Sequence, residues 1–488
     1  MKKTVRRTRL PGRCARFAVL ATVSAVVLLA FGISSASASI TCTDTIADQA
    51  TVNSALAGGG TVTVNGTCLG SFVATVSVTL QGGSPGATLT AAGLNNRVLK
   101  IETSSNATVT VKNLKITGGS NKSNGAGVFV DNSSSLTLNL QSDTITGNSS
   151  TNEGGGLKAV CCGGTTINMT GTVVSNNTSE GDGAGLYLEG DVTLNATNSA
   201  ITGNQAGPAG AGIWGGGVIV SLTGTTVSGN SAAVEGGGMW FEEADVTVEG
   251  STISNNKTTS SGLPTGGGGM WVAGADVSID HSRFTANTSG DYGGALASYG
   301  CTFIEITSSS IDHNSALDDA GAILNDADCG DATLNIDQST VAFNVGQTGD
   351  GGGIANYGEC DSTASVLVTN SSFGGNLATK GEGGGIYNSN GLGCGNATAN
   401  VTVANSNIGR TGNSINPNKA KYGAGFYNEN GDGSSSLSLQ SKTLVAGNQA
   451  SVNGGGVFNC GGAALSTAGS TLISNSPNNL VNAASCPP

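Results

Sequence analysis

Apolar positions recur along the chain in short alternating runs, and each run follows a triplet of small residues. Residues 236–256 show the full unit, GGGMWFEEADVTVEGSTISNN: a glycine triplet, an apolar residue, an alternating run and a final pair of asparagines. The apolar residue after the triplet occurs twelve times, at Val128, Leu157, Leu186, Ile213, Met239, Met270, Leu296, Ile323, Ile354, Ile386, Phe426 and Val457. The period is roughly 26–32 residues across most of the chain, which indicates a solenoid of stacked coils.

A second repeated mark is an asparagine three residues after a β-branched or aromatic residue. It stands at Asn148, Asn177, Asn204, Asn230, Asn256, Asn287, Asn314, Asn344, Asn376 and, after a longer interval, Asn448. Stacked coils would place these amides about 4.7–4.9 Å apart, where each can donate to one neighbour and accept from the other. Asparagine also tolerates the left-handed conformation of turns. We therefore expect a structural ladder and not a functional site.

The alternating runs predict three short strands per coil, the last of which ends at the asparagine. Propeller blades would need longer units of four antiparallel strands. We therefore predict an all-β fold: one right-handed parallel β-helix, with the usual handedness of parallel crossovers. It would contain about 12 regular coils after two or three irregular N-terminal coils and a short capping helix.

The pattern divides the chain into four segments. Residues 1–38 are predicted to be a secretory signal, since a basic start and an apolar run lead to a small-residue cleavage site. Residues 39–120 would hold the cap, with a helix over 44–56 that buries Ile46, Ala50 and Leu56, and the irregular coils. Regular coils would fill 121–478, and residues 479–488 would form a C-terminal cap. A membrane anchor at the N-terminus is the alternative to the signal.

Two further features belong to the C-terminal half. A second asparagine series, two residues after the apolar position, consists of Asn325, Asn356, Asn388, Asn428 and Asn459. Strand alternation turns this position inward, so the core is expected to change from aliphatic side chains to an amide ladder. Residues 411–418, TGNSINPN, are predicted to form a projecting loop.

Composition narrows the possible partners. The 79 glycines lack the strict every-third spacing of collagen. Without the seven cations of residues 1–38 the chain has 13 Lys and Arg against 32 Asp and Glu, a net charge of −19. Such a surface repels phosphate backbones, so we expect no nucleic-acid partner. Neutral glycans, cations or basic surfaces remain, and we expect a monomer without a membrane segment once the signal is removed.

The cysteines indicate an oxidising compartment, since ten of the eleven remain after signal removal. Because neighbouring coils lie close in space, the expected pairs are Cys42–Cys68, Cys301–Cys329, Cys360–Cys394 and Cys460–Cys486. Cys161 and Cys162 would form either a vicinal bridge or two free thiols.

The paired marks resemble a known family of repeats. GGAL (293–296) with FTAN (284–287), and GGI (352–354) with FGGN (373–376), are similar to the repeats of chlamydial polymorphic outer-membrane proteins and of many secreted bacterial β-helix proteins. The resemblance covers about 125–480, and residues 47–64 resemble the entry cap of β-helix enzymes. It implies a parallel β-helix. Those outer-membrane proteins end in a membrane β-barrel for which this chain has no room, so we expect plain secretion instead of autotransport.

The resemblance also introduces polysaccharide lyases and hydrolases, which share this fold, but fold does not imply activity. The arginines outside the signal, Arg97, Arg283 and Arg410, do not stand in a pectate-lyase-like context. The two histidines, His281 and His313, lack the flanking glycines of a polygalacturonase-like site. A glycosidase that uses two carboxylates remains open. The candidate catalytic acids are Glu242, Glu243, Asp318 and Asp319, with Asp326 and Asp328 nearby.

Acids also stand just before many glycine triplets: Glu153, Asp182, Glu235, Asp291, Asp319, Asp350 and Glu382. In a stack they would line one edge, where like charges repel unless solvent or cations screen them. The row therefore has two interpretations, a solvated stripe or a weak calcium site. The chain lacks the calcium-binding nonapeptide of repeat toxins, and we expect no other cofactor.

An aromatic row follows the inward apolar position by one residue. It includes all three tryptophans, Trp214, Trp240 and Trp271, in successive coils beside Tyr187. Alternation turns this position outward. The row would then be an exposed sugar-stacking platform with Glu189, Glu242 and Glu243 as polar partners, or a structural stack. The sequence therefore favours a secreted or cell-surface-associated, adhesin-like binding protein for polysaccharides or surface glycans. The alternative is a polysaccharide-degrading enzyme, either a glycoside hydrolase or a lyase.

Overall fold

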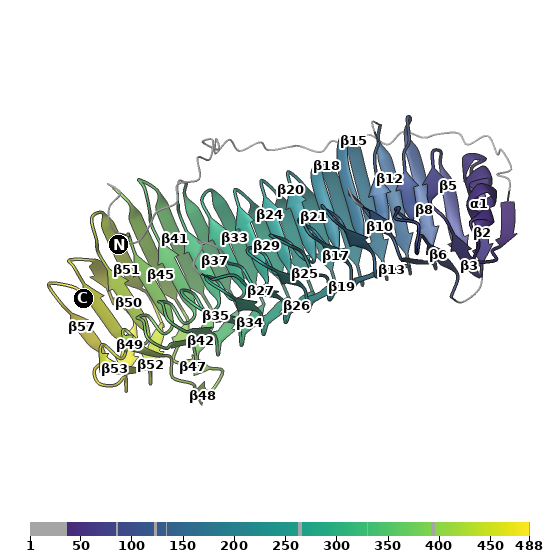
Figure 1. Ribbon diagram of the computed structural model, residues 1–488. Coiled ribbons are helices and arrows are strands. Elements are labelled where there is room, and N and C mark those ends of the chain that lie inside the picture. The colour runs from purple at the N-terminus through teal and green to yellow at the C-terminus, as the bar shows by residue number, and fades with distance from the viewer. Residues whose placement is uncertain are drawn as a thin grey trace. The chain divides into compact units, whose positions relative to one another are not determined.

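Parallel pairing between successive coils builds the molecule, and each strand lies beside its counterparts in the coils before and after it. The chain winds into a right-handed parallel β-solenoid of about 13 turns, with 3% helix, as predicted (Figure 1). The computed structural model describes residues 37–83, 86–121, 124–132, 134–261, 266–328, 330–391 and 396–487, all in one unit. The predicted signal lies outside these residues, apart from Ser37 and Ala38 in β1.

Most regular coils have four short strands, one more than the sequence predicts. In the central coil these are β24 (Met239–Glu242), β25 (Asp245–Glu249), β26 (Thr252–Ser254) and β27 (Lys257–Thr258). The fourth strand has two residues and follows the ladder asparagine, where two residues are too few to show alternation. The first and second positions form one 29-stranded sheet, the third a 15-stranded sheet, and the fourth sheets of three and eight strands.

The strands at the first position are β4 (Phe72–Ala74), β7 (Leu99–Ile101), β11 (Val128–Val130), β20 (Ile213–Gly216), β24, β28 (Met270–Ala273), β32 (Leu296–Tyr299), β36 (Ile323–Asp326), β40 (Ile354–Tyr357), β44 (Ile386–Ser389), β50 (Phe426–Glu429), β54 (Val457–Cys460) and β57 (Leu480–Asn482). Two long strands, β15 (Leu157–Thr170) and β18 (Leu186–Thr197), run through both the first and second positions. The strands at the second position are β1 (Ser37–Thr41), β2 (Gly60–Asn65), β5 (Val78–Gly82), β8 (Ala107–Lys112), β12 (Leu136–Gln141), β21 (Ile219–Thr223), β25, β29 (Asp276–Asp280), β33 (Thr302–Thr307), β37 (Ala332–Asp337), β41 (Thr363–Thr369), β45 (Thr398–Ala404), β51 (Ser434–Leu439) and β55 (Ala464–Ser466).

The strands at the third position are β3 (Thr67–Leu69), β6 (Thr88–Thr90), β9 (Lys115–Thr117), β13 (Thr144–Thr146), β16 (Val173–Ser175), β19 (Ala200–Thr202), β22 (Thr226–Ser228), β26, β30 (Arg283–Thr285), β34 (Ser310–Asp312), β38 (Thr340–Ala342), β42 (Ser372–Gly374), β46 (Asn407–Ile408), β52 (Leu444–Ala446) and β56 (Thr471–Ile473). The strands at the fourth position are β10 (Ser120–Asn121), β14 (Ser149–Ser150), β17 (Thr178–Ser179), β23 (Ser231–Ala232), β27, β31 (Thr288–Ser289), β35 (Ser315–Ala316), β39 (Val345–Gly346), β43 (Leu377–Ala378), β49 (Lys419–Tyr422) and β53 (Gln449–Asn453).

The glycine triplet makes the corner before the first strand. Gly236 has φ +56°, a conformation that other residues adopt at a cost. A Cβ on Gly238 would lie 2.5 Å from the carbonyl oxygen of Gly269 in the next coil and 3.0 Å from the Asn256 amide. The triplet therefore recurs because one position needs the left-handed conformation and another lies against both the next coil and the ladder.

The predicted asparagine ladder is confirmed. Side-chain amides of successive coils are joined by Nδ2–Oδ1 hydrogen bonds of 2.9–3.1 Å from Asn148 to Asn475. Asn230 shows the full pattern: its Nδ2 donates to Asn256 and to the Ile201 carbonyl, and its Oδ1 accepts from the backbone N–H and Nδ2 of Asn204. The left-handed residue is the one before the asparagine, as at Gly229 and Asn255, so that part of the sequence argument is wrong.

A second ladder, of hydroxyl groups, was not predicted from the sequence. The backbone N–H before each third strand donates to the hydroxyl of the next coil, as from Thr225 to Ser251 (2.9 Å) and from Ser251 to Ser282 (3.0 Å). Its members are Thr172, Ser199, Thr225, Ser251, Ser282, Ser309, Ser339, Ser371 and Ser406, preceded by Asp143. The sequence signal is a Ser or Thr two residues before the apolar residue of the third strand, which serine-rich turns obscure.

The inner asparagine series also forms the expected amide ladder in the core. The chain of side-chain bonds runs from Asn325 through Asn356, Asn388, Asn428 and Asn459 to Asn482, with donor–acceptor distances of 2.6–2.9 Å. The members from Asn325 to Asn459 are buried. Beside these ladders, the apolar inward side chains form one hydrophobic core that extends from Cys42 to Val457.

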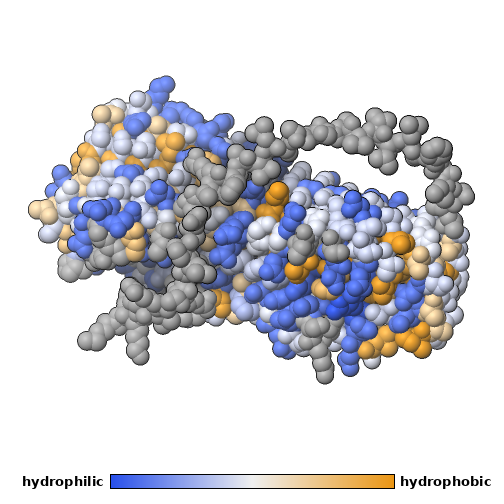
Figure 2. Space-filling model, turned by 90° about the horizontal axis from the view of Figure 1, so that it is seen from above, coloured by the Kyte–Doolittle hydropathy of each residue, from blue (hydrophilic) through white to orange (hydrophobic). Residues whose placement is uncertain are grey.

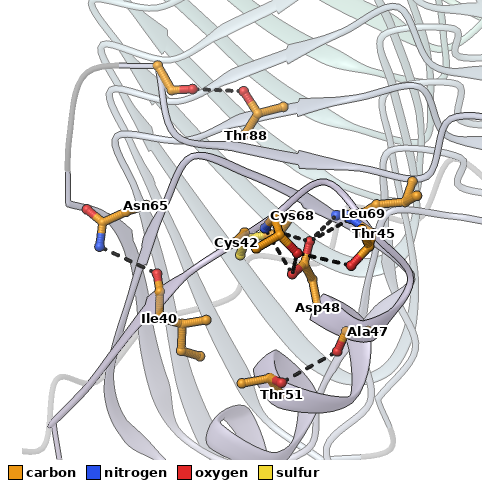
Figure 3. Close-up of a disulfide and its surroundings, with 12 residues drawn as sticks. Ile40, Cys42, Thr45, Ala47, Asp48, Thr51, Asn65, Cys68, Leu69 and Thr88 are labelled. Carbon is orange, nitrogen blue, oxygen red and sulfur yellow. Dashed lines mark hydrogen bonds between the residues drawn. A yellow bond between two sulfur atoms is a disulfide. The ribbon is translucent and has the colours of Figure 1, made fainter.

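The N-terminal end is covered by α1 (Ala47–Ala57), three residues later than the predicted start. Val52 and Leu56 are fully buried, whereas Ile46 and Ala50, the other two apolar residues of the predicted helix, are exposed. Figure 3 shows the cause of the shift: the Asp48 carboxylate accepts backbone N–H groups of Thr43, Thr45 and Leu69 beside the Cys42–Cys68 disulfide. These bonds hold the segment before Ala47 in a turn, so the helix begins later.

Two of the predicted disulfides are confirmed, Cys42–Cys68 and Cys460–Cys486. The other two pairs include Cys329 and Cys394, which lie outside the described residues. Cys161 and Cys162 lie in β15, and their side chains are outside the described part of the structure. At the C-terminal end, β57 pairs with β54 and so extends the sheet within the segment predicted as a cap.

The predicted projecting loop is a small hairpin of β47 (Arg410–Thr411) and β48 (Ser414–Ile415). Asn418, assigned to that loop by the sequence, is instead a fully buried member of the asparagine ladder between Asn376 and Asn448. The spacing hid it because this coil is longer than its neighbours.

Asn230→Ala is predicted to lower the free energy of unfolding by about 3 kcal/mol or more, because each buried polar group left unpaired costs roughly 1–3 kcal/mol. Urea denaturation measures the change. Asn195→Ala is the control, since Asn195 makes a single side-chain bond to Asn168 on the outer face. The control should cost about 0.5 kcal/mol or less. Equal effects of the two substitutions would refute a stabilising role specific to the buried ladder.

Candidate functional site

The predicted aromatic row is present on the outer side of the first strands. Tyr187, Trp214, Trp240 and Trp271 are in register across β18, β20, β24 and β28. Their ring centroids are 4.3, 4.9 and 5.0 Å apart, and the ring planes differ by 7° or less. The Lys158 ammonium lies 4.5 Å from the centroid of Tyr187 at one end, and Tyr299 stacks on Trp271 at the other.

The expectation that this row is an exposed strip is wrong. Tyr187, Trp240 and Trp271 are buried, with Trp271 only 2% exposed, and Trp214 is half-buried. Each ring is covered on both faces by its neighbours, and small residues such as Ala209, Ala273 and Ala297 pack around the row. Strand alternation gave the direction of the side chains correctly, but it did not show that neighbouring rings and small residues cover them. On the face in Figure 2, apolar residues form separate patches and no continuous strip.

The acid row and the aromatic row pack together. Glu235 stands five residues before Trp240 in the sequence and lies beside its ring. The Glu235 carboxylate accepts a hydrogen bond of 3.0 Å from Trp240 Nε1. Glu153 likewise pairs with Lys158, which takes the aromatic position in its coil. On the other flank the Tyr187 hydroxyl donates to Glu189 (3.1 Å). The two rows, predicted for different ligands, form one packed structure.

Several acids of the row also bind the backbone of the next coil. The Asp182 carboxylate accepts from the Ala209 N–H (2.9 Å), Asp319 accepts from the Asp350 N–H, and Asp350 accepts from the Glu382 N–H (2.7 Å). Asp319 also accepts from the Tyr357 hydroxyl at 2.9 Å. These acids therefore satisfy turn N–H groups, in addition to carrying charge.

Asp291 does not belong to the acid row in register. In the preceding coil the acid-row position is occupied by Gly266. Gly266 pairs with Tyr292, so Asp291 is displaced from the row by one residue. Asp291 is buried, unlike the half-buried Asp319. A one-residue displacement changes the direction of a side chain, and the triplet spacing alone does not reveal it.

Burial and neighbouring charges shift the pKa of several of these carboxyls upward. Burial, with the charges of Glu153 and Glu235, raises the pKa of Asp182 to about 6 although the Ala209 N–H opposes the shift. Burial, with the hydrogen bond to Glu382 and the charge of Asp319, also raises the pKa of Asp350. Protonation of Asp182 and Asp350 is therefore favoured relative to free carboxyls.

The candidate catalytic acids do not meet in one place. Glu242 ends β24, and Glu243 is exposed in the following turn with φ +52°. Asp318 and Asp319 precede β36, which lies three strand positions away from β24. Burial, with the charges of Glu359 and Asp328, raises the pKa of Asp326, the acid of this group most shielded from solvent. Within the described ranges, no three His, Cys, Asp or Glu side chains are placed to hold a metal ion.

A shallow open hollow lies on a different surface, the outer face of the second strands β25, β29 and β33. Its volume is about 320 Å³, and it is lined by Asp245, Val246, Thr247, Asp276, Val277, Ser278, Phe303 and Glu305. A second hollow, of about 370 Å³, is lined by Leu377, Ala378, Thr379, Lys419, Ala420, Gln449, Ala450 and Ser451 and has no aromatic residue. The Phe303 side chain is 42% exposed. The register places Asp245 beside Asp276 and then Phe303, with Thr247, Ser278 and Glu305 in the adjacent column. An aromatic ring thus stands among hydroxyl and carboxylate groups.

Sequence reasoning missed Phe303 because it followed the position after the glycine triplets. The available signal was the run TFIEIT (302–307), in which alternation turns Ile304 and Ile306 inward and Phe303 and Glu305 outward. No other second strand from β21 to β37 has an aromatic residue at its outward positions.

Comparison with known proteins finds no relative of this chain. No protein-family model matches the sequence, and no curated protein or solved structure matches it significantly. Among the described residues, no helix combines the length and apolarity needed to span a membrane. Arguments about function therefore depend on the sequence and the geometry of this chain.

Trp240→Ala is predicted to lower the free energy of unfolding by about 3–5 kcal/mol, as expected for removal of a large buried aromatic side chain. Trp240→Phe keeps a ring in the stack and should cost clearly less. Urea denaturation of both variants measures the difference. Wild-type stability of the alanine variant would contradict the packing role of the row.

Stability is predicted to fall as pH rises from about 4 to about 7. Burial raises the pKa of Asp143 from 3.8 to about 7, although the N–H groups of Leu114 and Gln141 oppose the shift. A raised carboxyl pKa in the folded state contributes stability that is present below the unfolded pKa and is lost as pH rises through the folded one. For Asp143 this amounts to about 4 kcal/mol, since one pKa unit is about 1.4 kcal/mol.

The test is thermal unfolding of Asp143→Ser between pH 4 and 8. Serine is a regular residue of this hydroxyl column, so the fold should persist while the pH dependence becomes weaker. Glu249→Gln, which removes an exposed carboxylate, should keep the wild-type slope. An unchanged slope in the Asp143 variant would exclude this carboxyl as the source.

Proposed function

We propose that the protein is exported and acts outside the cell as a non-catalytic binding protein, with a glycan as its ligand. The basic and apolar residues of the predicted signal and the two disulfides support export. The repeats similar to those of polymorphic outer-membrane proteins support an adhesin-like role at the cell surface.

The observation that carries the proposal is the hollow on β25, β29 and β33. Phe303 offers a ring face for stacking, and Thr247, Ser278 and Glu305 offer hydrogen-bonding groups to sugar hydroxyls within the same hollow. The buried tryptophan row offers no free ring face, because neighbouring rings cover it. The glycan site is therefore assigned to Phe303, and the tryptophans are assigned to stability.

A carboxylate pair favours the alternative function, cleavage of a polysaccharide. Asp245 and Asp276 are in-register neighbours on adjacent strands. Strands lie about 4.7–4.9 Å apart, which is near the separation of about 5–5.5 Å between the carboxyl groups of retaining glycosidases. Glu242, Glu243 and Asp318 have no such carboxylate partner, and Asp319, which lies beside Asp350, is engaged by the Asp350 N–H and the Tyr357 hydroxyl. The pair in the hollow is therefore the better candidate for catalysis.

Phe303→Ala is predicted to weaken glycan binding by about tenfold, because loss of stacking on an aromatic ring removes about 0.5–1.5 kcal/mol beyond its buried area. The measurement is a glycan array with residues 39–488, followed by calorimetry on the ligands retained. A reducing-sugar assay on each retained ligand tests for cleavage.

Phe343→Ala is the matched control, because Phe343 is 40% exposed on another part of the solenoid, where its ring stacks on His313. It should bind like the wild type. Equal losses in both variants would refute a site at Phe303. Retention of no glycan would overturn the proposed function, and release of reducing ends would favour the enzyme.

A further inference from the structure

The outer face of the proposed site contains an ordered column along the solenoid axis. Ile219, Asp245, Asp276 and Phe303 follow one another in register across β21, β25, β29 and β33. The two end residues are large exposed apolar side chains, Ile219 at 52% and Phe303 at 42%. The two middle residues are exposed carboxylates. The column is therefore apolar at its ends and anionic in its centre.

The charge of this face has one sign. The four strands contain Asp245, Glu249, Asp276, Asp280 and Glu305 and no Lys or Arg. Asp280 is bonded to the His281 ring and to the Thr307 hydroxyl, whereas the hollow itself is lined by Asp245, Asp276 and Glu305. A polyanionic ligand would be repelled here, and a ligand with cationic groups would gain attraction at the centre of the column.

We propose that the ligand of this face is an amine-bearing glycan, a polymer of 2-amino sugars, that lies along the solenoid axis. Sugar rings pack on Ile219 and Phe303, and ammonium groups between them face Asp245 and Asp276. This proposal depends on the proposed function, to which it adds the chemical class and direction of the ligand.

The register sets the length that such a ligand needs. Ile219 and Phe303 are separated by three strand steps, which corresponds to about 14 Å at the usual strand spacing. An oligosaccharide too short to cover this distance contacts one apolar end only. Affinity should therefore rise with ligand length until both ends are covered and then level off.

The electrostatic part of the affinity is moderate, because both carboxylates are exposed. Exposed ion pairs are worth about 0.2–1 kcal/mol each, so two pairs correspond to a preference of about two- to thirty-fold for the amine-bearing ligand over a neutral one. Salt should remove this preference, because the screening length falls from about 8 Å at physiological ionic strength to about 3 Å at 1 M.

The experiment compares glucosamine oligosaccharides of increasing length with their fully N-acetylated counterparts, by calorimetry at pH 5.5 in low and high salt. The proteins are residues 39–488 as wild type, Asp245→Asn/Asp276→Asn, Ile219→Ala and Glu180→Gln. Glu180 is an exposed acid outside this face and serves as the charge control. Circular dichroism verifies that each variant is folded.

The expected result is tighter binding of the amine form by wild type and Glu180→Gln, and loss of that preference in the double variant and at 1 M salt. Ile219→Ala should weaken long oligosaccharides more than short ones. Equal affinity for both forms, with binding still sensitive to Phe303→Ala, would overturn the amine assignment and leave the glycan site intact. Binding of neither form would overturn the amine assignment, and the proposed function would fail as well only if the glycan array also retained no ligand.

Discussion

The structure depends on the hydrogen bonds that run from coil to coil along the asparagine ladder. Each ladder amide uses both of its N–H groups and accepts two donors, so Asn230 links the side chain and backbone of Asn204 to Asn256 and to the carbonyl of Ile201. A buried amide with any of these partners missing would be costly. The ladder therefore fixes the register, so that most strand side chains of a coil lie opposite their counterparts in the next.

In-register stacking explains the chemistry of the outer surface. Tyr187 and the three tryptophans gain face-to-face contact because the same position recurs in four successive coils. The same rule brings like charges together in the row of acids, where turn N–H groups bind carboxylates and a raised pKa favours the neutral form, as at Asp350. At Asp245 and Asp276 no buried partner performs this role, and the charges face solvent. The two acidic surfaces thus differ in how they offset repulsion, and this difference separates a structural row from a candidate site.

The sequence was sufficient to predict the fold because the same pattern of residues recurs in twelve successive coils. The triplet before Met239, the alternation through Val248 and the ladder at Asn256 each predict the same coil, and the structure confirms them. The bounds of the elements were harder to predict. The hydrogen bonds of Asp48 move the start of the helix to a later residue, and a strand of two residues such as β27 is too short to show alternation. The candidate site was predicted poorly for a physical reason. Alternation shows that Trp240 points outward, but its burial depends on the stacked rings and small residues around it, which a period of two does not encode.

The long coil between Asn376 and Asn418 shows how this architecture separates chain length from shape. Its ladder residues are 42 positions apart, whereas those of the preceding coils are 26 to 32 apart. The hydrogen bond between their side-chain amides is nevertheless 3.0 Å long, like the others. Part of the additional length is taken up by the hairpin of β47 and β48 at one corner. New segments can therefore enter at this corner without any compensating change elsewhere in the chain. Such a scaffold can acquire or exchange recognition loops during evolution, or by protein engineering, one coil at a time.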